Sequence, residues 1–257
     1  MAYQTIKLEE AGSVLHLVLA RPKAYNSFDP DMRRELADAL KAIAKMEQVR
    51  VVILEGEGPG FSAGADLREN FPVPISGQLL GEYKPILEDL RALPQLTIAK
   101  IHGRAAGIGA AFALATDFMV MAEDASLYMA FAAIGLVPDG GLIWHLTNQI
   151  GPRKALEYII EGKEMGSEFC KAQGLVNHVV DPKDLNAFCA DWAASLASVA
   201  PIPARLVKSL VQENGKRDLA GTIEAEAYAQ DICQVSNDHA RARAAFLKKE
   251  RPQFKGD

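Results

Sequence analysis

The chain has 257 residues, a formal net charge of −5 and three cysteines. This length suits one large domain, or a domain with a small appendage, whose apolar core needs no metal or disulfide for stability. The mild acidic excess argues against a general nucleic-acid-binding protein, which normally carries a basic face. The cysteines are odd in number and far apart, so they predict neither a disulfide framework nor a metal site.

The N-terminal segment MAYQTIKLEEAG is polar, and it lacks the basic start and the apolar run of a signal peptide. No apolar run reaches the ~18 residues that are needed to cross a bilayer. We therefore expect a cytoplasmic protein that has neither a membrane nor a nucleic acid as its partner.

Two alternating runs, Tyr3–Leu8 and Val14–Leu19, flank a turn that contains glycine and predict a β-hairpin. Asp29 and Pro30 then predict the start of a helix, as its N-cap and its first residue. Apolar residues at helical spacing continue this helix through residues 32–46.

Three apolar runs further along the chain predict buried strands: Arg50–Glu55, Thr97–Ile101 and Phe118–Ala122. Between the last two lies Ala105–Ala115, whose small and apolar residues predict a buried helix. The alternation of strands and helices predicts an α/β fold with a largely parallel sheet and crossover helices.

Helical patterns dominate from Ile150 onward, apart from a short strand near Val176. From Leu185 the chain is expected to be almost entirely helical. We therefore expect a core of residues 1–200 and a helical C-terminal region of residues 201–257, a division that fits ordinary domain sizes.

Two glycine-containing loops follow predicted strands. The first loop, residues 60–67 (GFSAGADL), places Gly64 where a positive φ is easily adopted. The second loop, residues 102–111 (HGRAAGIGAA), leads into a helix whose first N–H groups lack partners and can bind an oxyanion. It resembles the start of a dinucleotide-binding GxGxxG motif, but Phe112 stands where a small residue is required.

Taken alone, each loop is compatible with an ordinary turn. Together, two strands of a parallel sheet deliver one backbone N–H each to the same edge. Two convergent donors are the minimum for an oxyanion hole, so the pair predicts such a site.

Asp139 lies in the sequence Pro-Asp-Gly-Gly. One interpretation is a turn in which its side chain bonds local backbone or caps the helix that starts near Gly141. The other is a carboxylate in an apolar setting beside Phe131, Ile134 and Trp144. Burial there would raise its pKa and make it a better proton carrier near neutral pH.

The order of FSAGAD, HGRAAGIGAAFALATDF and FAAIGLVPDGG resembles the crotonase superfamily, the enoyl-CoA hydratase/isomerase family. RPKAYNS at residues 21–27 is similar to that family's RPxxxNA motif, and AFLKKERPQF at residues 245–254 is similar to its AFxxKRxPxF ending. The resemblance extends from about Ile6 to Phe254. The alanine-rich helix after the second loop resembles the branch of the phenylacetate-pathway ring isomerase.

This resemblance implies a crotonase fold, a spiral of ββα units with a helical C-terminal trimerisation region. It implies a homotrimer or a dimer of trimers that acts on an acyl-CoA substrate, with no metal and no redox cofactor. The oxyanion N–H groups would belong to Ala65 and Ile108.

The resemblance also implies which residues bind CoA. Five residues would line the groove, mainly through backbone atoms: Lys23, Ala24, Ala63, Asp66 and Leu67. Phe246 and Lys249 would reach the CoA of a neighbouring subunit, although Lys249 also fits a solvated charge in a helical KKER run.

Two departures from the family pattern bear on the reaction. Relatives that hydrate enoyl-CoA use two glutamates, which fall here on Ala111 and Phe131, and neither residue can transfer a proton. Asp139 remains, at the position where the isomerase branch keeps its catalytic aspartate. We therefore expect an enolate between Ala65 and Ile108, with Asp139 moving a proton from one carbon to another and so shifting a double bond.

Two alternatives stay open: a hydratase or other crotonase reaction with an unidentified acid/base, and a non-catalytic relative that binds acyl-CoA or RNA. Structural roles are favoured for His102, His145 and His178. The segment Glu69–Gly81 contains several Pro and Gly residues, and we expect it to cover the acyl pocket as an irregular or mobile lid.

Overall fold

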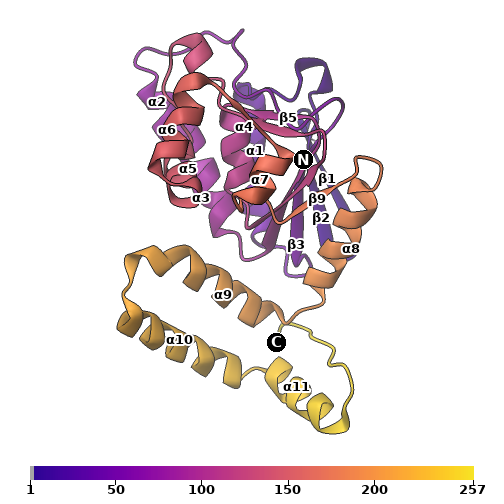
Figure 1. The fold of residues 1–257 in the computed structure, drawn as a ribbon. Coiled ribbons are helices and arrows are strands. Elements are labelled where there is room, and N and C mark those ends of the chain that lie inside the picture. The colour runs from indigo at the N-terminus through magenta and orange to yellow at the C-terminus, as the bar shows by residue number, and fades with distance from the viewer. Residues whose placement is uncertain (1–2) are drawn as a thin grey trace.

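The computed structural model describes residues 3–257. A six-stranded sheet has the spatial order β1-β2-β3-β4-β6-β9, with helices on both of its faces (Figure 1). Its strands are β1 (Ile6–Ala11), β2 (Val14–Leu19), β3 (Val51–Gly56), β4 (Leu96–Ile101), β6 (Phe118–Ala122) and β9 (His178–Val180). The first two strands form an antiparallel hairpin, and all the other pairings are parallel.

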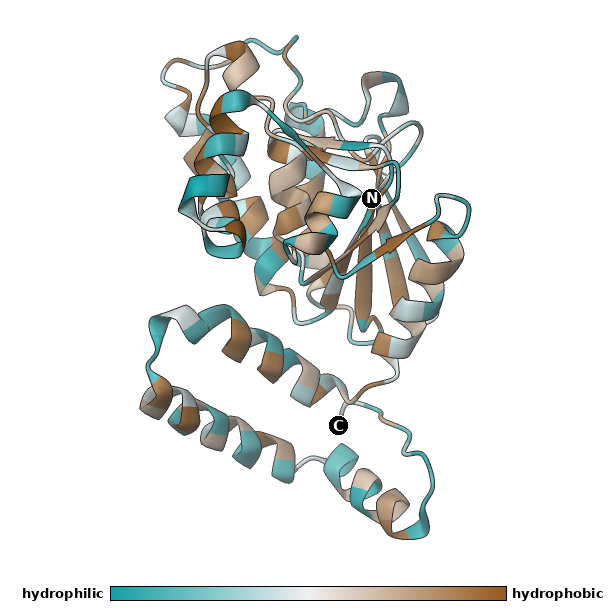
Figure 2. Ribbon diagram, in the orientation of Figure 1, coloured by the Kyte–Doolittle hydropathy of each residue, from teal (hydrophilic) through white to brown (hydrophobic). Residues whose placement is uncertain are grey.

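The central strands are apolar and buried along nearly their whole length, as Figure 2 shows by their hydrophobic colouring. Continuous apolar runs are typical of parallel sheets, because helices cover both faces. On one face lie α1 (Pro30–Ile43), α3 (Lys84–Ala92) and α4 (Ile108–Leu114), and on the other lies α8 (Leu185–Ala197) (Figure 1). The predicted hairpin, the first helix and the three buried strands are thus confirmed, with shifts of a few residues at their ends.

A second, three-stranded sheet lies beside the first. It consists of β5 (Arg104–Ala106), β7 (Ser126–Tyr128) and β8 (Glu164–Gly166), in which β5 and β7 are parallel. The prediction of one helix over Ala105–Ala115 was therefore wrong at its start. Ala105 and Ala106 pair with β7, and Gly107 at φ 52° turns the chain before α4 begins. Small residues are compatible with a helix or a strand, and the β7 residues that pair with β5 lie far along the chain. The local sequence therefore could not show that Ala105 and Ala106 belong to a strand.

Shorter elements connect these parts. They are η1 (Pro22–Ala24), α2 (Ser76–Gln78), the π-helix η2 (Leu79–Tyr83), η3 (Ala132–Ile134), α5 (Leu142–Ile150), α6 (Pro152–Glu161) and α7 (Ser167–Ala172). The segment Glu69–Gly81 is therefore not irregular throughout, because α2 and the first residues of η2 occupy its second half.

The C-terminal helices form a separate layer below the sheet (Figure 1). They are α9 (Pro201–Glu213), η4 (Asn214–Lys216), α10 (Leu219–Gln234) and α11 (Asn237–Lys248). The buried ammonium of Lys208 ties α9 to the core, at 2.8 Å from both the Gln95 carbonyl and the Asp117 carboxylate. The division of the chain at residue 200 stays a prediction, and α9 begins at Pro201.

Among residues 3–257 no single helix has the length and hydropathy of a membrane span. One pair bent by 104°, Leu185–Ala197 with Pro201–Lys216, reaches both thresholds only when its two helices are taken together.

Candidate active site

The two glycine loops lie side by side, joined by a short ladder of backbone hydrogen bonds. The Phe61 N–H donates to the His102 carbonyl at 3.0 Å, and the Ser62 N–H donates to the Arg104 carbonyl at 3.1 Å. In return, the Ala106 N–H donates to the Ser62 carbonyl at 2.8 Å. The meeting of the loops that the sequence predicted is therefore confirmed.

Glycine is required where the loops approach most closely. Gly64 has φ 94°, and a Cβ atom there would lie 2.9 Å from the Ala106 carbonyl oxygen. On the other side, a Cβ atom on Gly109 would lie 2.7 Å from the Ser62 Cβ. Any side chain at these positions would separate the loops.

Both predicted oxyanion donors have free N–H groups. Their neighbours are engaged, because the Asp66 N–H donates to the Phe28 carbonyl and the Gly107 N–H donates to the Tyr128 carbonyl. By contrast, the N–H groups of Ala65 and Ile108 find no acceptor among residues 3–257. Ile108 is the first residue of α4, where an N–H has no partner within the helix. Two unpaired donors on adjacent turns can together bind one oxyanion.

The side chain of Asn26 holds the start of the first loop in place through hydrogen bonds. Its side-chain amide donates to the carbonyls of Glu57 at 2.8 Å and Gly60 at 3.0 Å, and its side-chain oxygen accepts from the Arg21 N–H at 2.9 Å. The asparagine of the RPKAYNS segment is therefore an architectural residue, a role that sequence reasoning did not assign to it.

Three of the five predicted groove residues lie on two segments that a hydrogen bond joins. Lys23 and Ala24 lie on η1, and the Ala63 N–H donates to the Tyr25 carbonyl at 2.8 Å, which joins η1 to the first loop. Leu67 is 60% exposed, which leaves its side chain free for a ligand.

Asp66, the remaining groove residue, is buried, and its ionised carboxylate is paired with arginines. Hydrogen bonds from Arg68 hold the pKa of its carboxyl well below the usual range, and Arg21 lies 3.1 Å away. The Asp66 N–H donates to the Phe28 carbonyl and its own carbonyl accepts from the Glu69 N–H, so a contact of Asp66 with CoA stays a prediction.

Phe246 and Lys249 lie far from these five residues. Phe246 is on α11 and is 81% exposed, and Lys249 is the exposed C-cap of the same helix. The C-terminal layer that carries them stands apart from the glycine loops (Figure 1). Their contact with the CoA of a neighbouring subunit stays a prediction.

Asp139 lies between η3 and α5. The N-cap of α5 is Gly141, and no side chain caps it, so the capping interpretation of Asp139 was wrong. Its backbone carbonyl accepts from Leu142 at 3.1 Å, whereas its Oδ1 is buried with no hydrogen-bond partner in the described part of the chain.

The glycine after Asp139 brings this turn against the helix start that carries the second oxyanion donor. A Cβ atom on Gly140 would lie 2.5 Å from the Ile108 Cδ1 and 2.6 Å from the Ala111 Cβ. The Asp139 turn therefore packs directly on the start of α4, which carries the second donor. The alanine that replaces a family glutamate is part of this packing surface.

Burial raises the pKa of Asp139 to about 6. The carboxyl group lines a cavity of about 560 Å³ together with Tyr83, Leu87, Trp144 and His145. Of the predicted apolar neighbours, Trp144 is on this wall, but Phe131 and Ile134 are not. Phe131 is buried toward Gly107, and Ile134 is 47% exposed on the turn that ends at Gly135.

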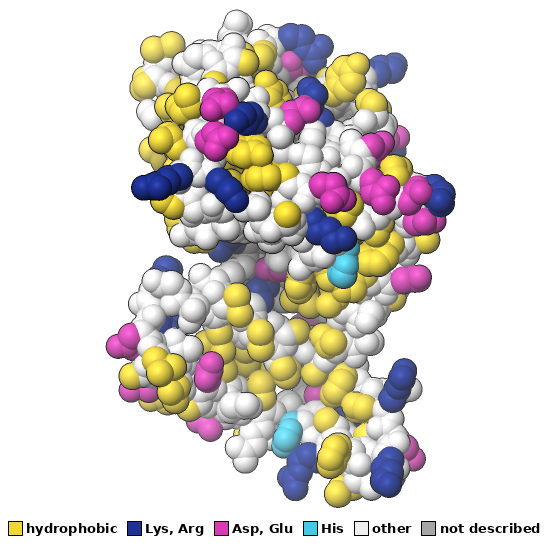
Figure 3. Space-filling model, viewed as in Figure 1, with side chains coloured by type: hydrophobic (Ala, Val, Ile, Leu, Met, Phe, Trp, Pro, Cys, Tyr) yellow, Lys and Arg dark blue, Asp and Glu magenta, His cyan; other side chains and the backbone are white. Residues whose placement is uncertain are grey.

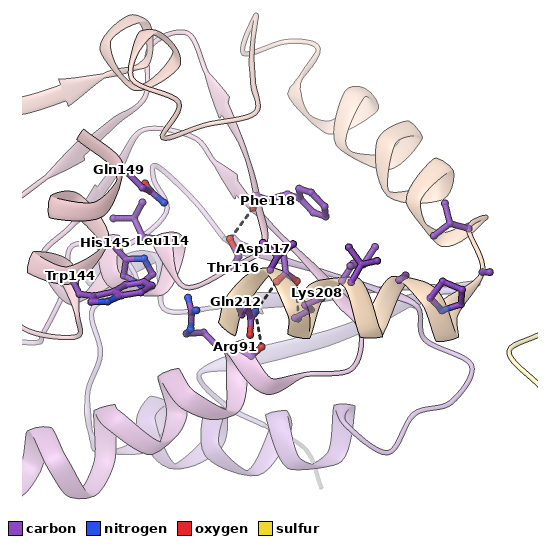
Figure 4. Close-up of a pocket in the computed structure, with 17 residues that line it drawn as sticks. Arg91, Leu114, Thr116, Asp117, Phe118, Trp144, His145, Gln149, Lys208 and Gln212 are labelled. Carbon is purple, nitrogen blue, oxygen red and sulfur yellow. Dashed lines mark hydrogen bonds and ion pairs between the residues drawn. The ribbon is translucent and has the colours of Figure 1, made fainter. Parts of the chain in front are cut away.

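A second cavity, of about 650 Å³, lies between the core and α9 (Figure 4). It shares four wall residues with the Asp139 cavity: Arg91, Trp144, His145 and Gln212. In Figure 4 Trp144 and His145 lie on the α5 side, opposite Lys208 and Gln212 of α9. Space for a ligand therefore continues past Asp139 toward the C-terminal layer.

The three histidines considered in the sequence differ in their surroundings. His102 donates a ring N–H to the Gly58 carbonyl at 2.8 Å, and His178 packs between the rings of Phe188 and Trp192, as structural residues do. His145 is different, because it lines both cavities and burial lowers its pKa to about 4. Its position on the cavity wall could not be read from the helical pattern alone.

A buried ion cluster also escaped sequence reasoning. The guanidinium of Arg33, on α1 and 2% exposed, binds both oxygens of Glu69 at 2.8 and 2.7 Å and one oxygen of Glu82 at 2.6 Å. The two carboxylates are 36 and 49 residues away along the chain, so no local pattern links them. The cluster anchors both ends of the predicted lid.

Comparisons with known proteins agree with this geometry. The enoyl-CoA hydratase/isomerase family matches residues 9–257. The chain is 32% identical over 249 residues to the 1,2-epoxyphenylacetyl-CoA isomerase of Escherichia coli (strain K12), with 95% of each chain covered. It is 31% identical over 258 residues to a probable enoyl-CoA hydratase of Rhodobacter capsulatus, with all of both chains covered.

Solved structures show the same architecture. The crystal structure of an enoyl-CoA hydratase from Bacillus anthracis, 31% identical in sequence, matches with a TM-score of 0.94 over 99% of this chain and 100% of that chain. The expected α/β crotonase fold is therefore confirmed. With a family match over nearly the whole sequence and relatives above 30% identity, the chain belongs to the enoyl-CoA hydratase/isomerase family.

Proposed function

We propose that this enzyme shifts a double bond within an enoyl-CoA thioester. The observation that carries the proposal is the Asp139 Oδ1 atom, which is buried without a hydrogen-bond partner on a turn that packs against Ile108. A buried carboxylate oxygen without a hydrogen-bond partner costs free energy, so its presence favours a chemical role over a structural one.

The reaction begins with the thioester oxygen between the N–H groups of Ala65 and Ile108. Asp139 removes a proton from the alpha carbon of a 3-enoyl thioester, and the electron pair of the broken C–H bond delocalises onto the thioester oxygen. The protonated Asp139 then returns the proton to the gamma carbon, which leaves a conjugated 2-enoyl product. Each oxyanion donor contributes ~10²–10³ in rate in other enzymes, and a tuned acid/base contributes ~10²–10⁴.

The pKa of Asp139 suits both of its roles. At about 6 it leaves the group mostly ionised at neutral pH, ready to accept a proton. A base with the usual carboxyl pKa would be weaker, and its conjugate acid would lose the proton to water more readily.

We propose that the CoA moiety of the substrate is bound by five residues: Lys23, Ala24, Ala63, Asp66 and Leu67. The chemistry uses backbone donors and one carboxylate and invokes no metal or redox cofactor.

We also propose a homotrimer or a dimer of trimers. Apolar side chains reach the surface on α9 and α10 (Figure 3). Four of them on α10 are about half exposed or more: Leu219, Ile223, Tyr228 and Ile232. Sedimentation analysis tests the assembly.

The test of the reaction is to incubate the protein with a 3-enoyl-CoA and to follow the absorbance of the conjugated product. Asp139→Asn should remove the activity while thioester binding persists. Asp124→Asn makes the same change at an exposed residue and should have no effect. Full activity of Asp139→Asn would contradict the assignment.

Hydration is the second candidate, and His145 is the observation that favours it. Water addition needs a second group beside Asp139, and His145 lines the same cavity as a neutral imidazole. Conversion of a 2-enoyl-CoA to the 3-hydroxy product, lost in His145→Gln, would support this reaction. Tight CoA binding without turnover of either substrate would instead indicate a non-catalytic binding protein.

A further inference from the structure

Tyr83 lies at the end of η2 and is 3% exposed. It lines the cavity of about 560 Å³ that contains Asp139. Its ring packs edge-on against Phe28, with 6.3 Å between the ring centroids. The residue is therefore fixed by packing, and it belongs to the wall of the proposed substrate pocket.

Arg33 determines how the Tyr83 hydroxyl can bond. One guanidinium nitrogen donates to the Tyr83 oxygen at 3.4 Å, and the guanidinium carbon lies 5.2 Å from the ring centroid. A guanidinium has no acceptor, so the proton of the hydroxyl cannot bond to Arg33. No acceptor for this proton is found in the part of the chain that the structure describes, residues 3–257.

Tyr83 remains protonated at neutral pH. Burial raises the pKa of its hydroxyl to about 12, and the nearby charge of Asp139 adds to the increase. The hydroxyl is therefore able to donate a hydrogen bond at neutral pH.

The cavity thus presents two polar functions that lack partners of their own. Asp139 Oδ1 has no hydrogen-bond partner, whereas the Tyr83 oxygen accepts from Arg33 and only its proton lacks an acceptor among residues 3–257. Because buried polar groups are almost always hydrogen-bonded, a ligand that fills the cavity is expected to satisfy both of them. Asp139 exchanges its proton with a carbon atom of the substrate and needs no substrate oxygen nearby. The Tyr83 hydroxyl, by contrast, needs an oxygen atom that can accept its hydrogen bond.

We propose that Tyr83 is a further substrate-binding residue, whose hydroxyl donates a hydrogen bond to an oxygen atom of the acyl group beyond its alpha carbon. The preferred substrates are then oxygen-bearing acyl thioesters, in the class of hydroxy-, oxo- or epoxyacyl-CoA. The inference rests on the proposed function, because it places an acyl-CoA beside Asp139. A site built to bond an oxygen rejects the analogue that lacks it, because the donor is then left unpaired.

The experiment measures binding by calorimetry, so it does not depend on turnover. The probes are 3-hydroxybutanoyl-CoA and 4-hydroxybutanoyl-CoA, each compared with butanoyl-CoA. The wild-type protein should bind at least one hydroxy ester about tenfold more tightly than butanoyl-CoA, the upper range for one neutral hydrogen bond. Tyr83→Phe should abolish this preference while butanoyl-CoA affinity changes by less than about twofold.

Two control variants separate specificity from general disruption. Tyr158→Phe removes the same hydroxyl from α6, where the ring stacks on Phe169 away from this cavity, and should leave the preference intact. Arg33→Lys keeps the charge but loses the fork that holds the tyrosine, and should reduce the preference without abolishing it.

Each contrary outcome has a distinct meaning. A wild-type protein without the preference, or a Tyr83→Phe variant that keeps it or loses affinity for all three esters alike, overturns the inference. Failure of every ester to bind wild type overturns the proposed function, and this inference with it. An Asp139→Asn variant that keeps full isomerase activity overturns the acid/base assignment but leaves the Tyr83 comparison intact.

Discussion

The two glycine loops and the Asp139 turn meet at the start of α4, but they are held in different ways. Backbone hydrogen bonds and close glycine contacts fix the loops, which leave the N–H groups of Ala65 and Ile108 free. The Asp139 turn is held by packing, and its carboxylate has an oxygen with no partner. The difference indicates a division of labour, in which a rigid backbone binds the thioester and one unsatisfied side chain moves the proton.

The largest effect is expected from breaking the loop pair. Gly64→Ala places a Cβ 2.9 Å from the Ala106 carbonyl oxygen at φ 94°, so the Ala65 N–H must move. Loss of one oxyanion donor predicts a fall of ~10²–10³ in kcat. Steady-state kinetics on a 3-enoyl-CoA give the measurement. The control is Gly77→Ala, where a Cβ meets nothing within 4 Å; equal losses in both variants would contradict the account.

A smaller effect is expected from displacing the Asp139 turn. Gly140→Ala drives a Cβ against Ile108 and Ala111 and moves the carboxylate away from the donors. A shift of about 1 Å predicts a fall in kcat of up to ~10². Gly135→Ala is the matched control, because Gly135 also has a positive φ but no atom within 4 Å of its Cβ position. An unchanged kcat in Gly140→Ala would mean that the contact does not position Asp139.

These glycine contacts mark the limit of what the sequence could predict. The apolar runs of β2, β3, β4 and β6 indicate buried strands through composition alone, and the order of motifs brings Asp139 and the two loops to one site. The packing of Gly140 on Ile108 is different, because it depends on how a later turn meets an earlier helix. The same holds for β5, whose residues pair with residues 22 positions later in β7, and for Arg33, whose carboxylate partners are remote in sequence.

The unsatisfied carboxylate should also lower stability. Its folded-state pKa of about 6 exceeds the unfolded value of 3.8, so folding binds a proton between these pH values and the ionised group destabilises the fold above them. Asp139→Asn should therefore raise the free energy of unfolding at pH 7 by up to about 3 kcal/mol. Urea titrations at pH 7 and pH 4 should show this gain shrinking toward the lower pH. A destabilised variant at pH 7 would indicate a structural role for the carboxylate.

The pH dependence of activity should also follow Asp139. Its ionisation lowers the stability of the fold but raises the activity. Asp139 must be ionised to accept a proton, so kcat/KM should fall about tenfold for each pH unit below about 6 and level off above it. Gly64→Ala should lower the whole profile without moving its midpoint, because the substitution neither adds nor removes a titrating group. A midpoint near the ordinary carboxyl value would show that burial does not tune Asp139 in the working enzyme.

The most direct test of the division of labour is deuterium exchange at the alpha carbon. A 3-enoyl-CoA is incubated in D₂O with wild-type protein, Asp139→Asn or Gly64→Ala, and label is located by mass spectrometry and NMR. Wild type should incorporate deuterium at the alpha carbon of recovered substrate and at the gamma carbon of the product, and Asp139→Asn should bind the thioester with unchanged affinity but exchange nothing. Exchange at the wild-type rate in Asp139→Asn would contradict the assignment of proton transfer to this residue.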